Sequence, residues 1–233
     1  MDKEKVIGEN MNVQLVTYTR DPDKVCAMAA YVSASSTPLS EFSEAWTEED
    51  TKKWIKIVVD RGHTSVLEHA SFTFSLEDVS RVCTHQLVRH RIASYTQQSL
   101  RRVEPKRESF KAPETVKNSV HYDRASHILD KLYEVYDALV DDDVPKEDAR
   151  FVLPMGTKTN LLVTMNCREL YEVFFPLRCC TRAQWEIREV AWKMLEICKE
   201  KAPIIFKNSG PRCKKLGYCP EGKPCKDFKK FVR

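Results

Sequence analysis

The sequence has 233 residues, of which 42% are hydrophobic and 31% are charged, and its formal net charge is +4. These values are ordinary for a globular protein and predict one domain with room for an appendage. No apolar run approaches the roughly 18 residues that a membrane span needs, and Met1–Lys5 lacks an apolar signal core. We therefore expect a cytoplasmic protein that spans no membrane.

Periodicity and capping signals predict the elements in chain order. Val13–Thr19 alternates as a strand, and Asp21-Pro22 then begins a helix that runs to about Ser33. Thr47 and Asp50 form a predicted capping box before a helix that ends at Gly62. Further strands are expected over 70–76 and 160–165, and further helices from Asp78, over 116–139, after Pro145, over 168–175 and over 181–201.

This order of elements indicates an α+β fold, a helix-rich domain with a small, mostly antiparallel sheet. Regular alternation of strands and helices is missing, which argues against a doubly wound sheet. So few strands also need helices to cover them. After Pro203 the composition changes to Gly, Pro, Lys and Cys, so we expect a domain over residues 1–205 and a basic, Cys-rich tail over 206–233.

The segment Arg89–Arg102 says most about function. It contains four arginines, a histidine, hydroxyl groups and two adjacent glutamines, and it contains no acidic residue. Guanidinium groups bind phosphate and carboxylate through paired, charge-assisted hydrogen bonds, so the segment suits a small, polar, phosphorylated ligand. The chain has neither GxGxxG nor GxxxxGK[ST], so side chains must supply much of the donor set.

Motifs spread along the chain resemble those of the flavin-dependent thymidylate synthases. Arg89-His90-Arg91, followed by seven residues and Ser99, is similar to the signature of that family. Further elements resemble the family in the same order, namely Arg61–His69, Asp148–Pro154, Asn166–Leu170 and Leu177–Ile187. The resemblance covers about residues 13–205.

The resemblance implies an α+β homotetramer that makes dTMP from dUMP. The carbon would come from 5,10-methylenetetrahydrofolate, and NADPH would reduce a bound FAD. No metal, nucleic-acid or membrane partner is implied. The residues that the resemblance places at FAD are His63, Ser65, Arg89, His90, Arg91, Gln97, Asn166, Arg168 and Glu172. Those that it places at dUMP are Gln86, Arg89, Gln97, Ser99, Arg101, Arg150 and Arg178.

Arg178 is the expected catalytic residue. Methylation of uracil requires carbon 5 to become nucleophilic, and an arginine near nitrogen 3 and a carbonyl oxygen can stabilise the resulting negative charge. Cys179 and Cys180 follow Arg178, but no partner base can be assigned to either thiol. The resembling family needs no cysteine nucleophile, and we expect none in this chain.

Some of these residues also have structural interpretations. Arg150 could be a helix C-terminal cation without a ligand, His63 could be a structural histidine, and Asn166 could cap the next helix. One residue more than the family pattern lies between Arg168 and Arg178, which leaves the alignment of Glu172 open.

Nine cysteines are many for a chain in a reducing compartment. Four of them lie in apolar or helical contexts and are expected in the core: Cys26, Cys83, Cys167 and Cys198. The tail cysteines Cys213, Cys219 and Cys225 could bind zinc, form a redox pair or stay reduced. Their spacing is not CxxC, and the sequence shows no fourth ligand.

Two other classes of function stay open on the sequence. A nucleic-acid-binding module would use the basic segments, although aromatic residues that stack on bases are sparse there. A flavoprotein with another substrate is the second alternative. An FAD absorption band would exclude the first, and turnover of dUMP would exclude the second.

Overall fold

The chain is described by a computed structural model over residues 11–106 and 108–232. The predictions drawn from Met1–Lys5 lie outside these residues. Within the described ranges, no helix is both long and apolar enough to cross a membrane. The strands are β1 (Asn12–Tyr18), β2 (Ser71–Ser80), β3 (Ala93–Gln97) and β4 (Lys158–Asn166). The α-helices are α1 (Pro22–Val32), α2 (Leu39–Phe42), α3 (Glu48–Arg61), α4 (Arg81–Leu87), α5 (Glu114–Lys117), α6 (Tyr122–Asp141), α7 (Lys146–Ala149), α8 (Phe175–Arg178), α9 (Trp185–Lys201), α10 (Arg212–Leu216) and α11 (Phe228–Phe231).

The four strands form one antiparallel sheet in the order β1-β2-β4-β3. Along β2 and β4 the side chains alternate between buried and more exposed positions, because successive residues of a strand point to opposite faces. The hydroxyls of Thr73 and Thr164 lie 2.9 Å apart and link these two strands. The predicted α+β class with a small antiparallel sheet is confirmed.

The described chain divides into two compact units. The first contains Leu76–Arg89 and Thr96–Leu162, with Met11 and Asn12. The second contains Val13–Ser75, His90–Tyr95 and residues 163–232. All four strands therefore contribute residues to both units, β1 through Asn12 alone in the first unit.

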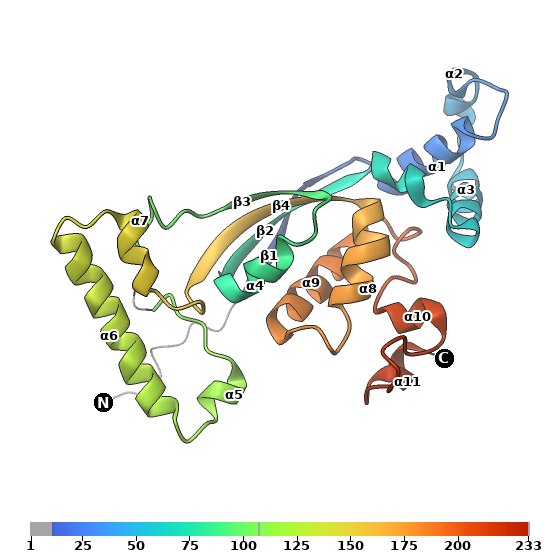
Figure 1. Cartoon of the computed structure of the whole chain (residues 1–233). Coiled ribbons are helices and arrows are strands. Elements are labelled where there is room, and N and C mark those ends of the chain that lie inside the picture. The colour runs from blue at the N-terminus through green and yellow to red at the C-terminus, as the bar shows by residue number, and fades with distance from the viewer. Residues whose placement is uncertain (1–10, 107, 233) are drawn as a thin grey trace. The chain divides into compact units, whose positions relative to one another are not determined.

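In the first unit, the long helix α6 packs on α7 and on the 3₁₀ turn Arg150–Val152 (Figure 1). Tyr133 of α6 is buried, and its hydroxyl lies 3.0 Å from the hydroxyl of Thr157. Helix α4 begins where the Ser80 hydroxyl accepts a hydrogen bond from the backbone N–H of Cys83. This cap places Gln86 on the last turn of α4 and Arg89 just beyond it.

In the second unit, aromatic side chains join the sheet to the helices. Phe72 and Phe74 of β2 stack with centroids 6.0 Å apart, and Phe206 meets both Phe72 and Phe175 edge-on. Figure 1 shows α8 and α9 beside each other in this unit, and the two helices pack together. All four cysteines predicted in the core are fully buried, Cys83 in the first unit and the other three in the second.

The structure corrects two predicted elements and adds one that was not predicted. The prediction of a helix from Asp78 is wrong, because β2 continues to Ser80, and Asp78 has a left-handed backbone conformation with φ of 56°. The single helix over 116–139 is wrong, because turns at residues 118–121 separate α5 from α6. The segment after Arg91 contains strand β3, which the sequence analysis did not predict.

Candidate functional site

The second unit contains a buried histidine held between two charged side chains. The side chain of His90 is 4% exposed and that of Glu169 is 3% exposed. His90 Nδ1 lies 2.9 Å from Glu169 Oε1, and Arg178 Nε donates to His90 Nε2 over 2.9 Å. The Tyr95 hydroxyl donates to the backbone carbonyl of His90 at 2.8 Å, and Phe174 packs edge-on against the imidazole. These contacts fix the imidazole ring and the backbone of His90 in position.

The hydrogen bonds determine the protonation state of His90. A guanidinium nitrogen can only donate, so Nε2 of the imidazole must accept. The ring proton then sits on Nδ1, where it is donated to the Glu169 carboxylate. Burial, with a further contribution from the Arg178 charge, lowers the pKa of His90 below its ordinary value of 6.5 and outweighs the Glu169 hydrogen bond. The neutral imidazole thus holds one edge of the Arg178 guanidinium.

The backbone before Arg178 is unusual in a way that explains the extra residue noted in the sequence. Glu169–Phe174 forms a π-helical segment, which leads directly into α8. A π turn accommodates one more residue than an α turn at the same place. Pro176 follows two residues later and lacks the N–H that would close a regular α turn, so it favours this wider winding. Arg178 is the last residue of α8.

A second polar cluster in the same unit gathers residues that were predicted at FAD. Arg168 Nε donates to Glu172 at 2.9 Å, and Arg168 Nη1 donates to Glu68 at 2.5 Å. The Thr64 hydroxyl donates to the other carboxylate oxygen of Glu172. Partial burial acts to raise the pKa of Glu172, but hydrogen bonds from Thr64 and Arg168 outweigh it and leave that pKa below its usual value. Glu172 is therefore an anion in this cluster.

The remaining residues predicted at FAD in this unit lie near its surface. His63 and Ser65, on either side of Thr64, are exposed, and Arg91 is exposed as well. Asn166 ends β4, and its side-chain oxygen accepts the backbone N–H of Glu169 at 2.8 Å. Asn166 thus caps the turn that carries Glu169, as its structural interpretation predicted.

In the first unit, Glu147 joins two arginines that are far apart in sequence. Arg101 Nε pairs with the Glu147 carboxylate at 2.6 Å, and Arg150 Nε donates to the Glu147 carbonyl at 3.0 Å. Ser99 accepts the backbone N–H of Arg101 at 3.2 Å, which shapes the turn after β3. Three residues predicted at dUMP are thereby brought into one neighbourhood.

Arg81 is a further cation of this neighbourhood that the sequence analysis did not select. Its Nε is buried and has no hydrogen-bond partner among the described residues. Burial, followed by the charge of Arg150, lowers the pKa of Arg81. A buried donor without a hydrogen bond costs free energy, and so does the repulsion between the charges of Arg81 and Arg150. A bound anion would lower both costs.

The two glutamines predicted as ligand contacts are also in the first unit. Gln97 is partly buried, and its Nε2 donates to the hydroxyls of Thr84 at 3.3 Å and Thr159 at 3.4 Å. Gln86 Nε2 donates to the Val82 carbonyl at 3.3 Å within α4. Arg89, predicted at both ligands, is exposed.

Comparisons with known proteins agree with the motifs. Residues 14–204 match the family model described as "Thymidylate synthase complementing protein". A flavin-dependent thymidylate synthase from Sulfurisphaera tokodaii is 49% identical over 87% of this chain and 79% of its own length. The enzyme of that name from Pyrococcus furiosus is 47% identical over 91% of this chain and 90% of its own. The chain belongs to the flavin-dependent thymidylate synthase family.

A solved structure has the same fold as this chain. The UMP/dUMP methylase PolB from Streptomyces cacaoi, solved with 5-Br dUMP, matches 86% of this chain and 95% of its own with a TM-score of 0.71 at 24% identity. The family membership confirms the resemblance seen in the sequence, and with it a flavin-dependent methyltransferase that makes dTMP. It thereby decides against a nucleic-acid-binding module as the class of this protein.

The side chains that sequence reasoning missed are mostly partners of those it found. Glu169 and Tyr95 hold His90, Thr64 holds Glu172, and Glu147 joins Arg101 to Arg150. Glu169 gave no distinct signal in the sequence, because Arg168, Glu169 and Glu172 are interspersed with the apolar residues between Cys167 and Phe175. Nothing in the sequence connects Glu147 with Arg101.

Proposed function

We propose that this chain is a cytoplasmic homotetramer that converts dUMP to dTMP, with 5,10-methylenetetrahydrofolate as the carbon donor and NADPH as the reductant of a bound FAD. The observation that carries the proposal is the guanidinium of Arg178, held by a buried, neutral His90. We further propose that residues 1–205 carry this activity and that residues 206–233 form an appended tail.

The donor set of the second unit fits a flavin dinucleotide. The exposed side chains of His63, Ser65 and Arg91 offer hydrogen-bond donors and a cation, as the diphosphate of FAD requires when no Gly-rich loop is present. Asn166, Arg168 and Glu172 complete the proposed set, with Arg89 and Gln97. When bound, FAD supplies the hydride-transfer chemistry of the reaction. The protein's part is to bind, orient and exclude water.

Arg168 fits this proposal only with an adjustment. Its guanidinium is already bonded by the carboxylates of Glu68 and Glu172, which neutralise its charge. A phosphate that approached it would have to displace one of these carboxylates. We therefore propose that Arg168 orients Glu172 and Thr64 at the flavin and contributes little net positive charge.

The first unit supplies the proposed contacts to dUMP. Arg101 and Arg150 offer two guanidinium groups to a phosphate, and the buried Nε of Arg81 adds an unused donor in the same neighbourhood. Gln86, Arg89, Gln97 and Ser99 complete the proposed set. PolB was solved with 5-Br dUMP, which supports a deoxyuridylate ligand for this fold.

Arg178 has the proposed catalytic role. A fixed guanidinium beside nitrogen 3 and a carbonyl oxygen of uracil stabilises the negative charge that makes carbon 5 nucleophilic. The hydrogen on carbon 5 then leaves as a proton, and a methyl group takes its place. Burial raises the pKa of the neighbouring Cys179 to about 12, so that thiol stays protonated at neutral pH. This supports a mechanism without a cysteine nucleophile.

The proposal is tested on the purified full-length protein. We expect a yellow protein with the FAD absorption band that releases tritium from carbon 5 of labelled dUMP and forms dTMP when methylenetetrahydrofolate and NADPH are added. UMP serves as the comparison substrate. A colourless protein that cannot be loaded with FAD would overturn the whole proposal. A yellow protein that turns over a different substrate and leaves dUMP intact would support the alternative flavoprotein.

A further inference from the structure

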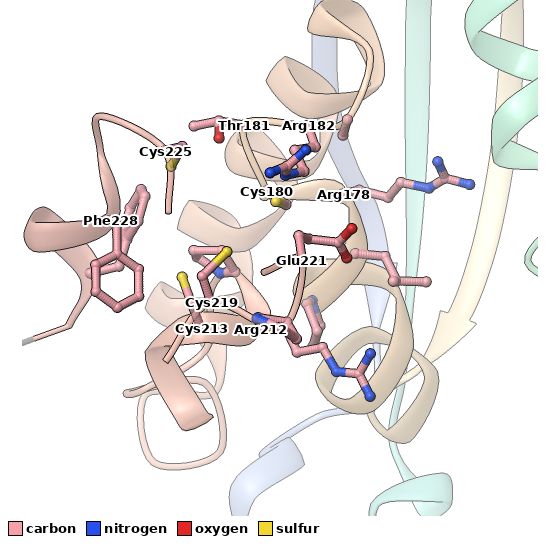
Figure 2. A pocket seen from close by; sticks show the side chains of 16 residues that line it. Arg178, Cys180, Thr181, Arg182, Arg212, Cys213, Cys219, Glu221, Cys225 and Phe228 are labelled. Atoms are coloured by element: carbon pink, nitrogen blue, oxygen red, sulfur yellow. The ribbon is translucent and has the colours of Figure 1, made fainter. Parts of the chain in front are cut away.

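Four of the nine cysteines line a single pocket in the second unit. Cys180, Cys213, Cys219 and Cys225 surround a space of about 240 Å³ (Figure 2). Cys180 follows α8, Cys213 lies in α10, and the other two lie in the turns between α10 and α11. Figure 2 also shows the Arg178 guanidinium directed away from these thiols. Arg178 lines part of the same pocket, but its guanidinium bonds His90 on the side away from the four thiols.

The thiols are near enough to affect one another electrostatically. Burial, followed by the neighbouring thiols of Cys180, Cys219 and Cys225, raises the pKa of Cys213. All four are free cysteines, and none is joined in a disulfide. Cys180 is the fourth thiol that the sequence could not reveal, because it is far along the chain from the tail.

We propose that Cys180, Cys213, Cys219 and Cys225 form a four-thiolate structural zinc site that fastens the C-terminal tail to the end of α8. Four sulfur ligands are the donor set that favours zinc in a closed, tetrahedral site. Such a site has no open coordination position, so its role is structural, and it is independent of the proposed synthesis of dTMP.

Hydrogen bonds and charge around the pocket suit thiolates. The Thr181 side chain and the backbone N–H groups of Asp227 and Phe228 donate hydrogen bonds to the Cys225 sulfur. Arg182 and Arg212 line the same pocket. Four thiolates around one divalent cation carry a net negative charge, which these arginines and the basic tail offset.

The sulfurs must move inward to bind a metal. Among residues 11–106 and 108–232, no three potential ligands are already gathered closely enough to hold an ion. The turns that carry the tail cysteines can adjust, because Gly217 and Gly222 lie in left-handed conformations with no atom near a Cβ position. Arg182 Nη2 already holds the Lys223 carbonyl at 2.9 Å, which keeps this loop beside Cys180.

The composition of the tail gives a reason for a metal cross-link. Residues 207–233 contain few large apolar side chains and nine lysines and arginines, too little apolar surface to fix so charged a segment by packing alone. A structural metal supplies binding free energy directly to the folded form. The short helices α10 and α11 pack on each other, and α10 packs on α8, so a metal would tie together elements that already meet.

The test measures metal content of the full-length protein purified under reducing conditions. We expect about one zinc per chain by elemental analysis, and cobalt substitution should give the absorption bands of tetrahedral thiolate coordination. Cys213→Ser and Cys180→Ala should each lower zinc occupancy at least about tenfold after dialysis, since one of four ligands is lost. Cys179→Ala is the matched control, because Cys179 adjoins Cys180 but does not line the pocket.

A second readout guards against variants that merely misfold. Trypsin should cleave the lysine-rich tail faster in Cys213→Ser than in the wild type, while flavin content and dTMP formation stay near wild type. The proposal is overturned if the protein contains no zinc and takes up none while its thiols are reduced. It is equally overturned if iron replaces zinc, if two of these cysteines form a disulfide, or if Cys213→Ser keeps its zinc.

Discussion

At the scale of single residues, His90 links the buried carboxylate of Glu169 to Arg178, the proposed catalytic residue. Glu169 fixes the proton on one ring nitrogen, and the other nitrogen accepts from Arg178. A guanidinium anchored through its Nε presents a defined plane, whereas a free arginine would sample many rotamers. His90 is therefore a positioning residue for Arg178 in this structure, and its predicted contact with FAD stays a prediction.

Replacing Arg178 tests the role of that anchored charge. Arg178→Ala should reduce dTMP formation by about a hundredfold or more, the scale for losing one preorganised charge donor. Arg178→Lys should recover little, since an ammonium cannot reproduce a planar two-point contact. Tritium release from carbon 5 of labelled dUMP is measured beside flavin absorbance.

The exposed Arg20 offers the control for this substitution. Arg20→Ala should leave both measurements unchanged, because that side chain is 96% exposed and pairs only weakly with Asp21. Normal tritium release in Arg178→Ala would contradict the activating role. Loss of FAD along with activity would instead move Arg178 to the cofactor.

The buried imidazole also predicts how stability depends on pH. The folded pKa of His90 lies below its ordinary value of 6.5, because of burial and then the Arg178 charge. Well above pH 6.5 the ring is neutral in both states and contributes no pH dependence. As pH falls below 6.5, the unfolded chain gains a proton that the folded chain refuses, so stability is lost, by at most about 1.4 kcal/mol per pH unit.

Urea unfolding from pH 8 to 5 measures this loss. His90→Asn should lower stability overall, since the ring also packs on Phe174, but its stability should fall less steeply with acid than that of the wild type. His127→Asn, at an exposed position of α6, should keep the wild-type slope. An unchanged slope in His90→Asn would show that the ring is not held neutral.

At the scale of elements, the sequence predicted the features that depend on residues close together in the chain. The capping box of Thr47 and Asp50 forms as predicted, and Gly62 ends α3 in a left-handed conformation. Asp21 occupies the predicted start of α1, but its side chain makes no cap. Strand β3 escaped prediction because its polar sequence becomes a strand only through pairing with β4. The boundary of β2 was misplaced because the Ser80 cap was overlooked.

The same distinction holds for the candidate site. The motifs selected residues that do cluster, such as Arg168 with Glu172, and Arg101 with Arg150. The sequence could not reveal the partners Glu169 and Glu147, or the pairing of His90 with Arg178, because these contacts join distant segments. Periodicity likewise cannot distinguish a π turn from an α turn, so only the extra residue before Arg178 signalled it.

The capping box of α3 gives a prediction at this scale. The Thr47 hydroxyl accepts from the Asp50 N–H at 3.1 Å, and the Asp50 carboxylate accepts from the Thr47 N–H at 3.0 Å. Thr47→Ala removes the first bond and should lower the free energy of unfolding by about 1 kcal/mol. Thr37→Ala, the same change at an exposed loop position, should cost much less. Equal urea midpoints for the two variants would show that the box contributes nothing.

At the scale of the whole molecule, the proposed ligand contacts divide between the two compact units. Most proposed dUMP contacts lie in the first unit, and most proposed FAD contacts lie in the second, with Arg89 and His90 on either side of the division. The first unit also exposes a large apolar side chain beside a proposed substrate residue. Phe151 follows Arg150 and is 84% exposed. Contact with a second copy of the chain would cover it.

Phe151 therefore tests the proposed homotetramer. Fully burying a phenylalanine side chain stabilises an assembly by about 1.5–3 kcal/mol per contact, and a carboxylate at that place would have to be desolvated instead. Phe151→Asp should thus shift light scattering and elution toward smaller species and lower dTMP formation with it. Phe151→Leu keeps an apolar side chain and should preserve both. If Phe151→Asp remains a tetramer with full activity, Phe151 does not lie in a subunit interface, and a monomeric wild type would reject the tetramer itself.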